Sequence, residues 1–158
     1  MKTVREAIAL VGLVFTVALV AEFYTRLPER LATHFNAAGE ANGFGGRSSL
    51  WVLVGVAALL YGLLTAINFL PPVMISLRAL GPERRRVIWT SVLSMVGWVK
   101  AEMVLVFAYL CVAIVRSGMG IELGAERAFL PVMMAVTGVT CGFYLAKIFG
   151  LLQRSDAV

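Results

Sequence analysis

The chain has 158 residues, of which 60% are hydrophobic and only 15% are charged. Its mean hydropathy is +0.88 and its net charge is +5. A soluble globular domain is about half apolar and about a quarter charged, so this composition excludes an ordinary soluble enzyme or soluble binding domain.

Four long apolar runs predict four membrane-spanning helices. They cover residues 7–24, 50–70, 87–115 and 128–150. Each run can cross a hydrocarbon core of about 30 Å at about 1.5 Å per residue. We therefore expect an all-α membrane protein in which residues 1–158 form a single four-helix transmembrane domain, with an ordered outer loop at residues 25–49 between the first and second helices.

Basic residues indicate the orientation of these helices. The first run follows two basic residues, as in a signal peptide, but no clean cleavage site follows it, so we interpret it as an uncleaved span. One side of the predicted membrane receives Lys2, Arg5, Arg78, Arg84, Arg85, Arg86, Lys147 and Arg154. Basic residues accumulate on the cytoplasmic side, so both termini are predicted to lie inside. The same rule accounts for the basic charge without nucleic-acid binding.

Prolines predict the ends of two helices. Pro71 and Pro72 end the second helix, and Pro82 opens the third. The apolar segment 73–80 is too short to span, so we expect it to lie along the inner membrane interface. The third apolar run is longer than a bilayer requires, and its helix should therefore tilt or protrude.

Small residues recur every four positions in two of the helices. They are Ala58, Gly62 and Ala66 in the second helix, and Gly138 and Gly142 in the fourth. This spacing lets two helix backbones approach closely, so these residues are candidate helix contacts, within the bundle or with a partner.

Two ionisable residues, Lys100 and Glu102, fall near the middle of the third span. Each costs about 2.5–3.5 kcal/mol at the centre of a bilayer. Residues two apart on a helix point in nearly opposite directions, so each charge needs a partner on another helix. Glu22 in the first helix is expected at a similar depth, about 22 Å from the inner helix ends, which makes Lys100 with Glu22 the favoured ion pair.

These three intramembrane charges have two interpretations. They could fix the register of the helices as a buried ion pair, or they could line a path for protons or ions. Thr65, Asn68 and Ser94 provide only a sparse chain of further polar groups, which favours the structural interpretation.

The outer loop holds the only histidine of the chain, His34. No histidine falls in a predicted span, so we expect no histidine-ligated haem and no other cofactor. His34, Asn36, Glu40 and Asn42 could form at most a weak cation site, and we predict no metal.

The same loop is expected to be an ordered cap over the helices. Gly39, Gly43 and Gly45 permit tight turns with positive φ. Leu31 and Phe44 require apolar surface, which the membrane interface or the outer mouth of the bundle can provide.

The loop sequence resembles a module of the SdpI immunity-protein family, over residues 22–70. The matching positions are Leu27, Pro28, Thr33, His34, Phe35, Asn36, Gly39, Glu40, Asn42, Gly43, Phe44 and Gly45. Two positions depart from the family pattern, with Ala32 where proline is common and Gly46 as an extra glycine. The resemblance implies a multi-pass protein of the bacterial plasma membrane. In the immunity proteins it further implies protection against a membrane-active peptide and capture of a regulator.

Three classes of function follow from these observations. The favoured one is a non-enzymatic interaction protein that contacts the lipid bilayer and another membrane protein or membrane-active peptide, as an accessory subunit or as an immunity protein. The second is a small transporter or ion-conducting protein that uses Glu22, Lys100 and Glu102. The third is a membrane enzyme or metal protein that uses the polar residues of the outer loop.

Overall fold

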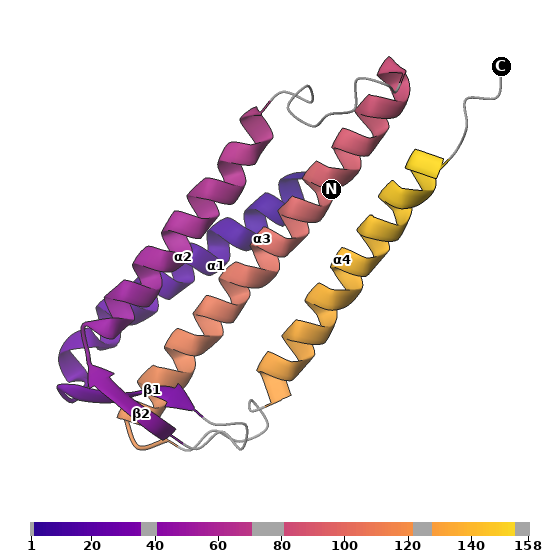
Figure 1. Cartoon of the computed structure of the whole chain (residues 1–158). Coiled ribbons are helices and arrows are strands. Elements are labelled where there is room, and N and C mark those ends of the chain that lie inside the picture. The colour runs from indigo at the N-terminus through magenta and orange to yellow at the C-terminus, as the bar shows by residue number, and fades with distance from the viewer. Residues whose placement is uncertain (1, 36–40, 71–80, 122–127, 154–158) are drawn as a thin grey trace.

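The computed structural model describes residues 2–35, 41–70, 81–121 and 128–153. The described residues form four long helices and one two-stranded β-hairpin (Figure 1). The helices are α1 (Lys2–Phe23), α2 (Ser49–Ala66), α3 (Pro82–Gly118) and α4 (Phe129–Gln153), and the strands are β1 (Arg30–Phe35) and β2 (Ala41–Gly46). Two short 3₁₀ turns, Tyr24–Arg26 and Ile67–Phe69, follow α1 and α2.

The prediction of four apolar helices with an ordered loop between the first two is confirmed. All four helices are long and apolar enough to cross a membrane. As predicted, Pro82 occupies the first turn of α3. Backbone N–H groups in the first turn have no acceptor within the helix, so a proline there costs no helical hydrogen bond. The segment 73–80, predicted to lie along the interface, falls outside the described residues.

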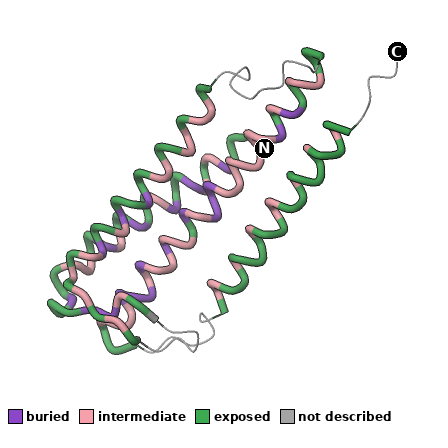
Figure 2. Tube along the Cα trace, in the orientation of Figure 1, coloured by how far each residue is buried: buried purple, intermediate pink, exposed green. Residues whose placement is uncertain are grey.

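Helix α3 is the centre of the bundle. It contacts α1, α2 and α4 as well as strand β1. In Figure 1, α2 and α4 lie on either side of α3, and α1 begins at the end of the bundle where α3 also begins and α4 finishes. Helix α4 has no buried residue, which Figure 2 shows as a tube without purple. The packed core is therefore formed by α1, α2, α3 and the hairpin.

Helices α1 and α3 run parallel, and glycines set their close approach. A Cβ atom on Gly12 would lie 3.0 Å from the side chain of Val104, and one on Gly97 would lie 3.3 Å from that of Arg5. Both contacts join residues 92 positions apart, so the start of α1 is level with about the thirteenth residue of α3. The first turns of α3 therefore project beyond α1. The expected tilt of α3, or its protrusion from the membrane, stays a prediction.

The outer loop contains a two-stranded antiparallel hairpin, which the sequence patterns did not predict. The register pairs Arg30 with Gly46 and Ala32 with Phe44. Gly43 stands opposite His34, and a Cβ on Gly43 would lie 2.8 Å from the His34 Cβ.

The proposed reason for the loop glycines was wrong. Among the described residues, the only glycine with positive φ is Gly120, and Gly43 and Gly45 have ordinary backbone angles. A Cβ on Gly45 would lie 3.0 Å from the Thr33 side chain. These glycines therefore make room for side chains of the facing strand. Gly39 lies outside the described residues.

Two leucines anchor the hairpin on the end of α3. Leu27 and Leu31 are buried, and a Cβ on Gly118 would lie 2.8 Å and 2.6 Å from their respective Cδ2 atoms. The Arg47 N–H donates to the Glu29 carbonyl over 2.9 Å and closes the base of the hairpin. Leu31 finds apolar surface at the end of α3, as one alternative of the cap prediction expected. Phe44 is 61% exposed, and its contact with the membrane interface stays a prediction.

Replacing Leu31 by alanine should loosen the hairpin from α3. The side chain is 1% exposed, and its truncation should cost about 2–4 kcal/mol. Faster hydrogen exchange of the β1 and β2 amides would report the loss. Phe44→Ala in the same hairpin is the matched control, with an expected change below about 0.5 kcal/mol. Equal exchange in the two variants would contradict this anchoring.

Candidate functional site

Lys100 is fully buried in the centre of α3 and binds groups on two other helices. Its Nζ lies 2.6 Å from Glu6 Oε1 of α1 and donates to Thr65 Oγ1 of α2 over 2.9 Å. The same Nζ lies 4.7 Å from the ring centre of Tyr61 on α2. The Tyr61 hydroxyl completes the group by donating to Glu6 Oε2 over 3.4 Å. We call these four residues the Lys100 cluster.

The favoured sequence pairing of Lys100 with Glu22 was wrong. Glu22 lies near the other end of α1 and forms an exposed ion pair with Arg26 over 2.5 Å. The depth argument assumed that the first and third helices begin at the same level. Because α3 starts about three turns before α1, Lys100 is level with the first turns of α1 and meets Glu6 there.

Glu102 faces α4, on the opposite side of α3 from the Lys100 cluster. Thr140 of α4 donates to Glu102 Oε1 over 2.7 Å. The second carboxyl oxygen, Oε2, is buried with no hydrogen-bond partner among the described residues. The prediction that Lys100 and Glu102 require partners on different helices is confirmed, and this hydrogen bond is the polar contact between α3 and α4.

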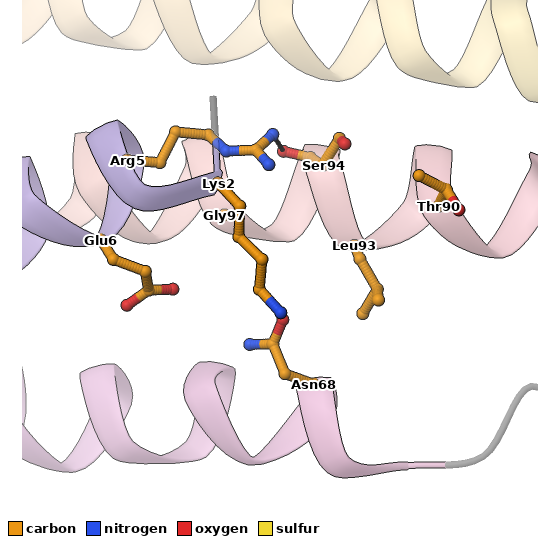
Figure 3. Close-up of a pocket in the computed structure, with 8 residues that line it drawn as sticks. All are labelled: Lys2, Arg5, Glu6, Asn68, Thr90, Leu93, Ser94 and Gly97. Atoms are coloured by element: carbon orange, nitrogen blue, oxygen red, sulfur yellow. Dashed lines mark hydrogen bonds between the residues drawn. The ribbon is translucent and has the colours of Figure 1, made fainter.

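A polar pocket opens beside the Lys100 cluster, at the end of the bundle where α1 begins (Figure 3). Its volume is about 260 Å³. Polar residues from α1, α3 and the turn after α2 line it: Lys2, Arg5, Glu6, Asn68, Thr90 and Ser94. Leu93 and Gly97 complete its wall.

The hairpin residues of the sequence motif form a compact structural unit. His34 Nδ1 and Asn42 Oδ1 lie 2.5 Å apart, across the two strands. Asn36 and Glu40, the other two residues of the weak cation site, lie outside the described residues. No three potential metal ligands cluster within the described ranges. Of the rest of the motif, Thr33 faces Gly45, and Pro28 packs near Gly118.

The two small-residue stripes do not pack against other helices of this chain. Ala58, Gly62 and Ala66 are exposed on α2, and Gly138 and Gly142 are exposed on α4. A Cβ on Gly62, Gly138 or Gly142 would meet nothing within 4 Å among the described residues. Contact inside the bundle was therefore the wrong interpretation of these stripes, and contact with a partner stays a prediction.

Sequence reasoning missed Glu6, Arg5 and Tyr61, three residues that define the site. Arg5 was interpreted only as a basic residue of the cytoplasmic side, and Glu6 was not considered because it precedes the apolar run, although α1 begins at Lys2. Thr65, Asn68 and Ser94 were recognised as intramembrane polar groups, and all three lie in or beside the site. The signal that could have identified Arg5 and Glu6 is the occurrence of opposite charges at residues 5 and 6. A helix that begins at Lys2 places both of these residues within the bundle.

Removing either charge of the Lys100 pair should destabilise the bundle, by unequal amounts. Glu6→Ala leaves a fully buried ammonium without its anion and should cost about 3–5 kcal/mol. Lys100→Met leaves a carboxylate that is one-third exposed at the pocket and should cost about 1–3 kcal/mol. Reversible unfolding in mixed micelles measures both. Glu22→Ala is the matched control, expected to change stability by less than about 1 kcal/mol; a loss there equal to that of Glu6→Ala would contradict the pairing.

Thr140→Val should weaken the attachment of α4. It removes the hydrogen bond to a buried carboxyl group whose other oxygen is already unpartnered, at a cost of about 1–3 kcal/mol. Combining Glu102→Leu with Thr140→Val removes the unpartnered carboxyl group and should recover most of the lost stability. Disulfide trapping between cysteines introduced into α3 and α4 measures the contact. If the double variant forms the α3–α4 disulfide no better than Thr140→Val alone, this role of Glu102 is contradicted.

Comparison with protein families connects the hairpin to a known sequence domain. Residues 11–58 match the family model described as "Domain of unknown function (DUF1648)". The match includes the whole hairpin and parts of the two helices that flank it. Neither the curated proteins nor the solved structures gave a match to this chain. The chain is therefore a multi-pass membrane protein that carries this domain of unknown function at residues 11–58.

Proposed function

We propose that the protein is a non-enzymatic integral membrane protein that binds a transmembrane helix of another polypeptide. This proposal rests on the observation that the two small-residue stripes are exposed on the outside of the bundle. Apolar surface alone gives no preference for protein over lipid within a bilayer, because lipid tails are equally apolar. Small residues at four-residue spacing do give a preference, since they allow backbone contact with a second helix.

The stripe on α4 points away from the rest of the chain. Thr140 and Phe129 mark the face of α4 that meets α3, through the bond to Glu102 and the stacking of Phe129 on Tyr109. At 100° per residue, Gly138 and Gly142 are each about 160° from Thr140 around the helix. A partner helix can therefore pack on this stripe without displacing α4 from α3.

A second membrane polypeptide fits this arrangement better than a second copy of the chain. The stripes of α2 and α4 lie on helices that flank α3 on either side (Figure 1). A two-fold dimer uses one self-complementary surface and would cover only one of them. A larger membrane complex, in which this chain is an accessory subunit, can cover both.

The resemblance of the hairpin motif to the SdpI family supports a related version of this proposal. In that version the partner is a membrane-active peptide or a regulator captured at a bacterial plasma membrane. Both versions place the partner helix on the outside of the bundle, and they differ only in its identity.

The transporter alternative receives less support from the geometry. Glu22 is paired with Arg26 at the hairpin end, while Lys100 and Glu102 face opposite sides of α3. The three charges therefore do not follow one another along a common path through the described part of the chain.

Enlarging the stripe on α4 should release the partner. Gly142→Leu is expected to lower co-purification of a stoichiometric membrane partner in mild detergent at native expression level, because the added side chain separates the two backbones. Val132→Leu adds bulk to an exposed position on another side of the same helix and should leave the partner bound. Mass spectrometry of the co-migrating proteins measures both.

Two outcomes would overturn this function. The first is a wild-type protein that purifies with nothing attached. The second is a protein that associates only with itself, which would replace the hetero-complex by a homo-oligomer.

A further inference from the structure

Arg5 is a buried cation that has no anionic partner in the described part of the chain. It is only 7% exposed, and no described carboxylate forms an ion pair with it. Its Nη1 donates to the Ser94 carbonyl over 3.0 Å, and its guanidinium lies 5.9 Å from the ring centre of Trp98. Its Nε is buried with no hydrogen-bond partner. Burying a charge in this state is costly unless a counter-ion is available.

Gly97 provides the space for this guanidinium. A Cβ at Gly97 would lie 3.3 Å from Arg5 Nε and 3.6 Å from Arg5 Cζ. The absence of a side chain there lets the arginine lie flat against α3 at the wall of the pocket. The arginine is therefore held in place by its surroundings before any ligand binds.

The charge balance of the pocket is positive. Glu6 is the only carboxylate that lines it, and that charge is already matched by Lys100. Lys2 and Arg5 thus leave two positive charges at the same cavity. Figure 3 shows Lys2 extending across the pocket from α1 toward Asn68, while Arg5 reaches the backbone of α3.

Neutral polar groups complete a site for an anion. Ser94 contributes a hydroxyl group from α3 and Asn68 contributes an amide after α2, whereas the Thr90 hydroxyl already donates to the Arg86 carbonyl over 2.9 Å. The volume of about 260 Å³ is below that of pockets for drug-sized ligands, so it fits a small group rather than a large molecule.

We propose that this pocket binds the phosphate group of an anionic ligand. A guanidinium and an ammonium that line the same cavity suit a phosphate, because arginine donates charge-assisted hydrogen bonds and lysine adds a point charge. The pocket lies at the end of the bundle where α1 begins, on the side that the basic residues predict to be cytoplasmic. An acidic phospholipid of that leaflet carries a phosphate in its headgroup, and a soluble phosphate ester is the other source of the same group.

The test uses the full-length protein reconstituted in equimolar phosphatidylglycerol and phosphatidylcholine. After extraction in mild detergent, native mass spectrometry measures which lipid stays bound. We expect selective retention of phosphatidylglycerol, reduced about tenfold by Arg5→Gln and also by Lys2→Gln. Arg30→Gln removes one positive charge from the hairpin at the other end of the bundle and is the matched control.

Competition distinguishes the two sources of phosphate. Retention that survives excess inorganic phosphate assigns the pocket to a lipid headgroup, whereas displacement by inorganic phosphate assigns it to a soluble phosphate ester. Equal retention of both lipids together with no rise in the unfolding temperature on adding inorganic phosphate, or equal loss in all three variants, would overturn the proposal. Lys2 is exposed at the rim of the pocket, so the Lys2→Gln variant should have the same unfolding temperature as the wild type. This variant therefore still tests the proposal if Arg5→Gln fails to fold.

Discussion

A lysine ammonium sealed inside an apolar bundle must find an anion and hydrogen-bond acceptors within it, because neither lipid nor the core supplies water. Lys100 finds them on two neighbouring helices at once, in Glu6 and Thr65. This requirement fixes how far α1 and α2 can slide along α3. The glycine contact of Gly12 with Val104 and the seat of the hairpin on Gly118 are consistent with that single register. The polar pocket exists because the same register leaves the first turns of α3 uncovered by α1.

The helices were predictable because apolar runs of this length have few alternatives in any membrane protein. The register was not predictable, since it depends on where each helix begins relative to its neighbour. In the sequence, residues 2–6 look like a polar tail. In the structure they form the first turn of α1 and place Glu6 beside Lys100. The strands were also missed, because both are short and β2 is rich in glycine. Neither strand has the alternation of apolar and polar residues that marks a strand in a sequence.

Charged residues in this chain have three different roles that composition alone does not separate. Glu22 and Arg26 form an exposed pair of small energetic value. Glu6 and Lys100 form an internal pair that holds three helices together with Thr65. Arg5 is buried with no counter-ion among the described residues and, in our proposal, binds an anion from outside the chain. The predicted effects of Glu6→Ala, Glu22→Ala and Arg5→Gln differ for this reason, although each variant removes one charge near an end of the same helix.

The seat of the hairpin on Gly118 has a consequence for how the matched domain folds. Residues 11–58 contain both strands, but the surface on which Leu27 and Leu31 rest belongs to the far end of α3, sixty residues beyond the last matched position. During synthesis the hairpin therefore leaves the translocation machinery before its support exists, and it reaches its final packing only after the third helix has been inserted. The segment defined by sequence similarity therefore lacks the surface on which its own hairpin packs in this chain, and residues 11–58 are not a self-contained packing unit.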